Sequence, residues 1–190
     1  MGFLDVITGK RKLAPPAPDR LFAMSTAYVT FETELSLRST GAAAIVFQPL
    51  PTSDFDAIVR DMEEVVRATA GDSGTRVETS DDTYGFRWLV LKGGEFDDLV
   101  VGINAVSSAL EAGGYGERLL CAVFAFSDDR TQSVYWIYNY KRGSFYPFVP
   151  AGGAQQRDNE RELRLKAQAG KELPLETELQ RWFPLWGSPI

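Results

Sequence analysis

Histidine is absent from this 190-residue chain, and its absence excludes several kinds of catalytic and metal site. Histidine is the most common general base near neutral pH and a frequent zinc ligand. A Ser-His-Asp triad, a deaminase site of the His-x-Glu type and a histidine-rich metal site are therefore all excluded.

Cysteine and long apolar runs are also scarce. Cys121 is the only cysteine, so no internal disulfide can form, and it lies in an apolar run where small buried thiols are common. No stretch approaches the roughly 20 consecutive apolar residues of a membrane-spanning helix, and the N-terminus carries its charges after its apolar residues, the reverse of a secretory signal. We therefore expect a cytoplasmic protein that neither spans a membrane nor is exported.

Positive charge is in short supply. The chain has 20 Lys and Arg residues against 26 Asp and Glu residues, which gives a formal net charge of −6. The longest basic run is Lys10-Arg11-Lys12. Because a polyanion would be repelled on average, nucleic-acid binding is disfavoured.

The remaining composition is that of an ordinary globular protein, with 44% hydrophobic and 24% charged residues. The length favours one main domain. We divide the chain into an N-terminal amphipathic segment with a proline-rich spacer at 1–18, an α+β domain at 19–150, and a C-terminal helical segment at 151–190 that packs on the domain.

Strands are predicted where apolar residues alternate with polar ones or form short continuous runs. Residues 28–37 alternate and predict a half-buried strand, which a turn at 39–41 joins to a buried strand at 42–47. Residues 76–80 and 83–92 predict a second hairpin.

Helices are predicted where apolar residues recur at steps of three and four. The clearest lies at 53–70, with Ser53 as its N-cap and Gly71 as its left-handed exit. A second lies at 95–112. Its acidic first turn would repel a phosphate, so the preceding Gly93-Gly94 pair is interpreted as a structural turn.

The stretch from Leu119 to Pro150 is the most strand-like part of the chain. Aromatic and β-branched residues crowd three runs that short polar loops separate, which predicts an antiparallel meander. The fold class that follows is α+β, with a mostly antiparallel sheet built from hairpins and the meander, and with helices packed on one face.

Composition changes after the meander. Residues 151–162 are rich in Gly, Gln and charge, and 163–171 hold few apolar residues, so both are predicted to form a solvated connector. Pro174 can open a last helix, which Pro184 ends and which carries Trp182 on an apolar stripe.

Adjacent acids could in principle hold Mg²⁺ or do acid-base work. They occur at Asp81-Asp82, Asp97-Asp98 and Asp128-Asp129. Neighbours on a strand point to opposite sides, and neighbours on a helix diverge by roughly 100°, so such pairs seldom aim at one ion. We assign them to turns and helix caps, and we expect no metal and no cofactor.

Aromatic residues of the meander and the tail are the candidate partner-binding residues. Alternate side chains of 134–140 lie on opposite faces, so one aromatic face can stay open beside Lys141 and Arg142. The alternative is that the C-terminal segment closes this face. The candidates are Tyr135, Trp136, Tyr138, Tyr140, Trp182 and Trp186.

The N-terminal segment is a candidate membrane contact, because apolar residues flanked by basic ones suit the lipid interface. The alternative is that it docks on the protein's own core or is a loose chain end. The residues concerned are Phe3, Leu4, Ile7, Lys10, Arg11 and Lys12.

Several short stretches are similar to those of one known family. They are Met1-Gly-Phe-Leu-Asp5, Gly9-Lys-Arg-Lys12, Leu21-Phe22-Ala23, Phe47-Gln-Pro49 and the ending from Leu179 to Ile190. Over nearly its whole length the chain thereby resembles the PspA-associated proteins of the PspAB type. The resemblance implies a cytoplasmic accessory protein of the phage-shock-type envelope stress response, associated with the membrane-remodelling protein PspA. It implies no reaction and no binding residues.

Our leading hypothesis is a non-enzymatic adaptor of a PspA-type envelope stress response that acts by protein contact, with PspA as the candidate partner. We expect it in the cytoplasm, with peripheral contact at the inner face of the membrane as a further candidate. A second hypothesis is a secretion-chaperone-like module that binds a peptide or protein. A third, which we favour least, is an enzyme that depends on carboxylates and a metal. The oligomeric state stays open.

Overall fold

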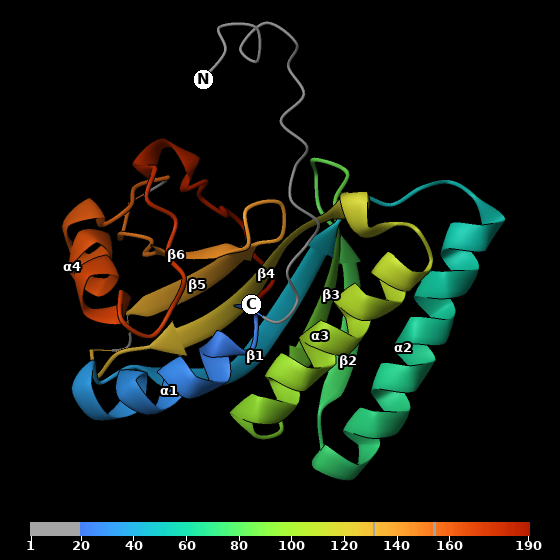
Figure 1. Ribbon diagram of the computed structural model, residues 1–190, viewed down its shortest axis with the longest axis horizontal. Helices are drawn as coiled ribbons and strands as arrows, with labels where there is room; N and C mark the ends of the chain where they lie inside the picture. The colour runs from blue at the N-terminus through green and yellow to red at the C-terminus, as the bar shows by residue number, and fades with distance from the viewer. Residues whose placement is uncertain (1–19, 131, 154) are drawn as a thin grey trace, which may run out of the picture.

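A computed structural model describes residues 20–130, 132–153 and 155–190, with side chains except those of residues 69–73 (Figure 1). The segment 1–18 and its candidate membrane residues Phe3, Leu4, Ile7, Lys10, Arg11 and Lys12 lie outside the described residues. The described part forms an antiparallel sheet of order β2-β3-β1-β4-β5-β6. The strands are β1 (Arg38–Phe47), β2 (Arg76–Asp81), β3 (Arg87–Lys92), β4 (Leu119–Ser127), β5 (Ser133–Asn139) and β6 (Ser144–Phe148).

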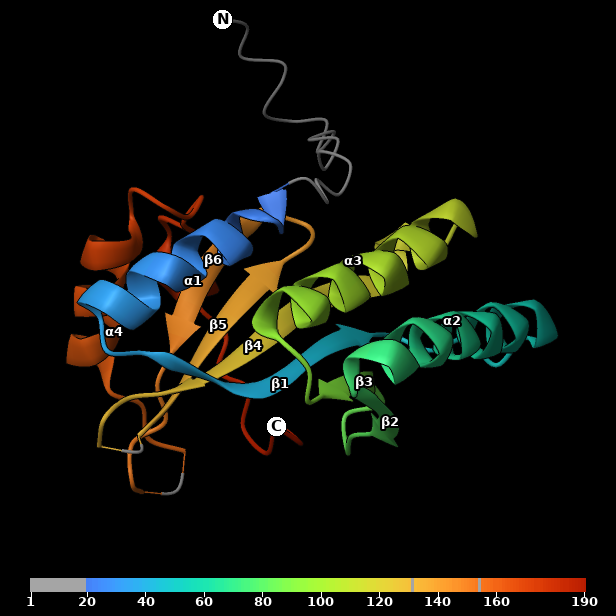
Figure 2. The same ribbon diagram turned by 90° about the horizontal axis from the view of Figure 1, so that it is seen from below.

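Helices cover one face of this sheet, as Figure 2 shows for α1, α3 and α2. The described helices are α1 (Ala23–Glu34), α2 (Ser53–Ser73), α3 (Phe96–Ala112) and α4 (Asn159–Ala169), the last of which lies beside β6. Leu165 and Ala169 of α4 belong to the same apolar core as the buried residues of the other three helices. The predicted α+β class, with helices on one face of an antiparallel sheet, is therefore confirmed.

The sheet has a second apolar layer on its other face. Alternation along each strand sends Val123 and Ile137 to this side, while Phe124 and Trp136 face the helices. No helix covers the second layer in the described part of the chain. It is covered in part by the C-terminal tail, which contributes Trp182 and further residues from 185 onward.

The predicted strand at 28–37 is wrong, because these residues lie mostly in α1. The helix buries Met24, Ala27 and Phe31, which recur at steps of three and four, whereas Val29 is exposed. Tertiary packing decides the outcome: the ring of Phe31 stacks on that of Trp136, with centroids 5.0 Å apart. Alternation over a ten-residue window can arise by chance on a helix whose buried face is narrow.

The predicted turn at 39–41 is also wrong. These residues belong to β1, which runs on through them with a bulge between Ser39 and Ala42 in its pairing with β4. Gly41 has φ +72°, a conformation that suits glycine, so the glycine bends a strand instead of ending it.

The predicted helices at 53–70 and 95–112 are confirmed, with shifted ends for the first. Thr52 is the residue whose side chain accepts a hydrogen bond from the Phe55 amide, at 3.4 Å, so it replaces Ser53 as the cap. The helix continues past Gly71 to Ser73, and Gly74, with φ +75°, follows it. Gly93 also has a positive φ, and a Cβ there would meet the Gly74 carbonyl oxygen at 3.0 Å, which supports a structural role for the glycine pair at 93–94.

Both predictions for the C-terminal part need correction. Residues 159–169 form helix α4, where a solvated connector was predicted. Asp158 caps this helix, and Glu162, Leu165 and Ala169 are buried. The predicted helix from Pro174 does not form: this stretch is extended, with one 3₁₀ turn at Leu179–Arg181. Its backbone bonds to β6 instead, since the Phe145 amide donates to the Pro174 carbonyl oxygen at 2.8 Å.

The described helices are too short or too polar to cross a membrane, because none of them combines the length and the hydropathy that crossing a bilayer requires.

Candidate functional site

Three of the six candidate aromatic residues do not form an open surface. Trp136, Tyr138 and Tyr140 have 0%, 0% and 1% of their surface exposed and belong to the core beneath the helices. The prediction of an exposed face is therefore wrong for them. The physical reason is that most of residues 28–37, predicted as a strand, belong to helix α1. This helix covers this end of the sheet, with Phe31 stacked on Trp136.

The other three candidates lie on the helix-free face and hold the tail against the sheet. The Tyr135 hydroxyl donates to the Ile190 carbonyl oxygen at 2.9 Å. Trp182 is 5% exposed and stacks on Tyr146, with centroids 6.1 Å apart. Trp186 meets the ring of Phe148 edge-on at 4.9 Å. The helices cover the face that carries Trp136 and Tyr138, and the tail covers part of the opposite face. The alternative that the C-terminal segment closes the face left open by the helices is therefore confirmed in part.

Beside the tail, the helix-free face is hollowed into a groove of about 520 Å³, which we call the aromatic groove. One wall is the turn that joins β2 to β3, and the other is residues 183–186 of the tail. Its lining residues are Val46, Asp82, Tyr84, Phe86, Trp88, Leu120, Cys121, Asn139, Lys141, Tyr146, Phe183, Pro184, Leu185 and Trp186. Most of them are apolar or aromatic, as in sites that bind an apolar partner group.

Two exposed aromatic side chains form the rims of the aromatic groove. Tyr84, in the β2–β3 turn, is 73% exposed, and Phe183, in the tail, is 60% exposed. Large aromatic side chains contribute strongly to protein interfaces because they bury much area at a small cost in side-chain entropy. The aromatic groove therefore offers two contact residues at its mouth and a largely buried floor.

Asp82 fixes the wall that carries Tyr84. Its Oδ1 accepts hydrogen bonds from the amides of Tyr84 and Phe86 at 2.8 and 3.0 Å, and its Oδ2 accepts one from the Trp88 indole at 3.0 Å. Burial opposes ionisation, but these donors outweigh it and lower the pKa of Asp82. The carboxylate thus holds a turn, as predicted, whereas its neighbour Asp81 lies at the end of β2 and pairs with Arg87.

The opposite wall is anchored by hydrogen bonds to the tail backbone. The Trp182 indole donates to the Glu176 carbonyl oxygen at 3.2 Å, and Arg157 donates to the Trp182 carbonyl oxygen at 2.7 Å. The Tyr146 hydroxyl donates to the Phe183 carbonyl oxygen at 3.1 Å. These contacts give an extended segment a defined position without a helix.

Cys121 lies on the floor of the aromatic groove and is 8% exposed. Burial raises the pKa of its thiol to about 12. Because the thiolate is the nucleophilic form, this cysteine is unreactive at neutral pH and acts as a small apolar floor residue.

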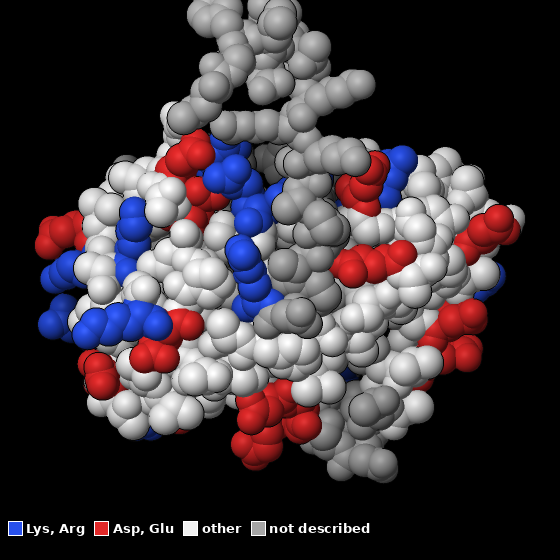
Figure 3. Space-filling model, viewed as in Figure 1, with Lys and Arg blue, Asp and Glu red and all other residues white. Residues whose placement is uncertain are grey.

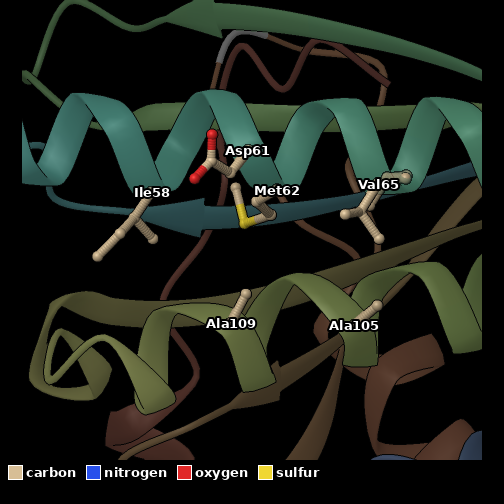
Figure 4. Close-up of a pocket in the computed structure, with 7 residues that line it drawn as sticks. Ile58, Asp61, Met62, Val65, Ala105 and Ala109 are labelled. Carbon is tan, nitrogen blue, oxygen red and sulfur yellow. The ribbon is translucent and has the colours of Figure 1, made fainter.

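A smaller hollow lies on the helix-covered face, between α2 and α3 (Figure 4). It measures about 190 Å³ and is lined by Ile58, Asp61, Met62, Val65, Val66, Ala105 and Ala109. The alanines of α3 are short, so the hollow is a shallow gap between two packed helices. We take the larger aromatic groove as the candidate functional site.

One member of each remaining acid pair has a structural role. Asp98 completes a capping box at the start of α3 with Glu95. Asp128 accepts hydrogen bonds from the backbone amides of Arg130 and Gln132, both at 2.9 Å, and forms an ion pair with Arg161 at 2.8 Å. Across the described ranges, no three side chains of Asp, Glu or Cys gather in a way that could hold a metal ion.

Charge is unevenly spread over the helix-covered face. Figure 3 shows acidic side chains prevailing over the α2 end and basic ones towards α4 and the middle of the face. The aromatic groove lies on the opposite face, where Lys141 and Asp82 are its charged lining residues. Arg142, which was predicted with Lys141 at the margin of an open aromatic face, forms an ion pair with Glu176 at 2.8 Å.

Sequence reasoning missed Tyr84, Phe86 and Phe183 as site residues. An aromatic residue inside a polar turn, as Tyr84 is within 81–85, is the signal that could have identified the first wall. Phe183 next to Trp182 could not be assigned to a side until the expected helix was replaced by an extended tail.

Comparison with known proteins gives one family. The model of the family described as PspA associated protein B matches residues 1–190. No curated protein and no solved structure matches the chain.

Proposed function

We propose a function from the premise that this chain belongs to the PspA associated protein B family. The family name indicates association with PspA. We propose that the protein is a non-enzymatic adaptor of a PspA-type envelope stress response, and that it acts by direct protein contact at the cytoplasmic side of the membrane.

The aromatic groove carries this proposal, because its chemistry suits contact better than catalysis. Its rims are exposed aromatic side chains, and its floor is apolar. Asp82 is occupied by three donors, and the raised pKa of Cys121 keeps its thiol protonated. Tyr84 and Phe183 are the groups best placed to contact another molecule, because their exposed rings provide aromatic surface that a partner can bury.

The test is a calorimetric titration of PspA into the purified full chain. We expect Tyr84→Ala and Phe183→Ala each to weaken binding by about tenfold or more, the usual cost of losing an aromatic contact at an interface centre. Val29→Ala is the matched control, because Val29 is 64% exposed on α1, on the other face of the sheet. Its affinity should equal that of wild type.

Two outcomes would overturn parts of the proposal. Equal affinity of wild type and both groove variants would remove the aromatic groove as the contact site, although the association could stand. Comparable binding of unrelated extended peptides would favour the secretion-chaperone-like alternative. A separate titration with Mg²⁺ and Mn²⁺ tests the enzyme hypothesis, for which saturable binding at the acid pairs would be required.

A further inference from the structure

The two edges of the sheet are treated differently by the chain. At the β6 edge, the Phe145 amide donates to the Pro174 carbonyl oxygen and the Glu176 amide donates to the Phe145 carbonyl oxygen, both at 2.8 Å. Pro147 also lies within β6, where proline removes a donor from the edge. This edge is closed by the protein's own tail.

The β2 edge has no such proline, and no segment of the described chain is bonded along it. Its pairing with β3 runs without a register shift from Arg76 opposite Lys92 to Asp81 opposite Arg87. The strand contains no proline and no lysine, and within the described residues the sheet order ends at it. Figure 2 shows β2 at the end of the sheet, below α2. Natural sheets usually blunt such an edge, because a regular exposed strand is a template for another strand.

The pattern of backbone bonds identifies which groups face outward. The Asp82 amide donates to the Phe86 carbonyl oxygen at 2.9 Å, so this pair is hydrogen-bonded. In an antiparallel ladder, bonded and non-bonded pairs alternate along the strands. Val77, Thr79 and Asp81 are therefore in non-bonded pairs with β3, and their amides and carbonyls point to the free edge.

Two acidic side chains of β2 stay exposed at this edge, although each has a basic partner on β3. Glu78 and Asp81 each keep 55% of their side-chain surface exposed while paired with Lys92 and Arg87 of β3. On the helix side, Glu63 of α2 accepts a hydrogen bond from the Thr79 hydroxyl at 2.6 Å. An incoming strand would gain from basic residues opposite Glu78 and Asp81, because opposite charges stabilise cross-strand pairs.

We propose that the β2 edge binds an extended segment of a partner protein by antiparallel strand addition. The segment places apolar residues opposite Val77 and Thr79 and basic residues opposite Glu78 and Asp81. An extended backbone is the occupant that the outward amides and carbonyls select, because only a strand offers donors and acceptors at the same spacing. This surface is separate from the aromatic groove and does not depend on the function proposed for it.

The probe is the blocked peptide Lys-Thr-Val-Lys-Val-Glu, written to run antiparallel from Asp81 to Arg76. Titrated into the full chain, it should slow amide exchange at Val77, Thr79 and Asp81 by about fivefold or more, since these amides gain acceptors. The amides of Glu78 and Ser80 already bond to β3 and should change little. Equal slowing at all five positions, or none, would overturn strand addition.

Two matched substitutions separate the edge backbone from its side chains. Thr79→Pro removes an outward amide without touching the ladder to β3, and should weaken peptide binding by about tenfold. Thr79→Val keeps the amide and loses only the contact with Glu63, so its affinity should stay within about twofold of wild type. Equal affinity of the proline and valine variants would contradict the proposal.

Peptide controls keep the test decisive if the proline variant fails to fold. N-methylation of the two valines blocks their bonds to Thr79 and Val77 and should abolish binding to the wild-type chain. A charge-reversed peptide, with Glu at positions one and four, should bind about tenfold more weakly. Dimerisation of the chain alone, with protection of the same three amides, would identify a second copy as the occupant and overturn the proposal.

Discussion

The Trp88 indole N–H and the Asp82 carboxylate are joined by a 3.0 Å hydrogen bond across the β2–β3 hairpin. The same carboxylate holds the turn that presents Tyr84. A buried floor residue and an exposed rim residue of the aromatic groove are thus linked through one acidic side chain, so the groove's shape depends on the charge state of Asp82.

Asp82→Asn should lower the free energy of unfolding at neutral pH by about 1–2 kcal/mol, because the indole loses a charged acceptor. The pKa of Asp82 is lowered in the folded state, so its contribution is present above the unfolded value of about 3.9 and is lost as pH falls below it. Urea unfolding at several pH values should therefore show the gap between wild type and variant closing below about pH 4.

Other carboxylates, such as Glu176, also have lowered pKa values, so both proteins lose stability in acid and only the difference between them reports on Asp82. Asp129→Asn is the control, since Asp129 is an exposed member of another acid pair. A gap between wild type and Asp82→Asn that stays constant from pH 7 to below about pH 3 would contradict this account.

Glu162 should be the acidic residue of α4 whose loss costs most stability. Its side chain is 2% exposed, and it accepts hydrogen bonds from the Val149 amide at 2.9 Å and from Arg157 at 3.0 Å. Glu162→Ala removes the acceptor of the Val149 amide and the carboxylate partner of Arg157, and should lower the free energy of unfolding by about 3 kcal/mol. Glu160→Ala, on the same helix but 83% exposed, should change it by no more than about 0.5 kcal/mol. Similar values for both variants in urea unfolding would show that the buried pair is not an anchor of α4.

Trp136 should behave as a core residue and not as a contact residue. Trp136→Ala should lower the free energy of unfolding by about 3–5 kcal/mol, because it leaves a cavity beside Phe31. Trp136→Phe should cost much less, since the indole nitrogen has no hydrogen-bond partner among the described residues. Tyr84→Ala, at an exposed position, is the comparison and should change stability by no more than about 0.5 kcal/mol. Denaturant unfolding checks the order, and a stable Trp136→Ala protein would contradict it.

The strands from β2 onward could be predicted from the sequence because their signals are local. Hairpin turns at 81–86 and 127–133 separate runs of β-branched and aromatic residues, and each run is long enough to set its own register. The helices α2 and α3 have wide apolar faces and were predictable for the same reason. In these elements local preference and tertiary packing agree.

The first helix and the tail could not be predicted because their signals are not local. Val29 and Thr33 supply β-branched residues that mimic a strand, and only burial of Phe31 against Trp136 selects the helix. The tail from Pro174 is extended because its backbone forms hydrogen bonds with Phe145, a residue distant in sequence, in place of the bonds of a helix. The aromatic groove could not be predicted for the same reason, because one of its walls is formed by the tail and the other by the β2–β3 turn.

Alkylation of the one cysteine reports on the floor of the aromatic groove. Because the pKa of Cys121 is raised to about 12, the thiolate fraction rises about tenfold with each pH unit across the range in which the protein is handled. The rate with iodoacetamide should follow it from pH 7 to about pH 10 without levelling, whereas the urea-unfolded chain should level near the free-thiol pKa of about 8.5.

Levelling of the native rate near pH 9 would mean that Cys121 is not buried on the groove floor. The same reaction extends to binding, because a molecule seated between Tyr84 and Phe183 would cover Cys121. PspA at saturating concentration should therefore slow alkylation of wild type, with Val29→Ala behaving as wild type. Tyr84→Ala should need about tenfold more PspA for the same protection. Protection that is lost in Val29→Ala as readily as in Tyr84→Ala would contradict a contact confined to the aromatic groove.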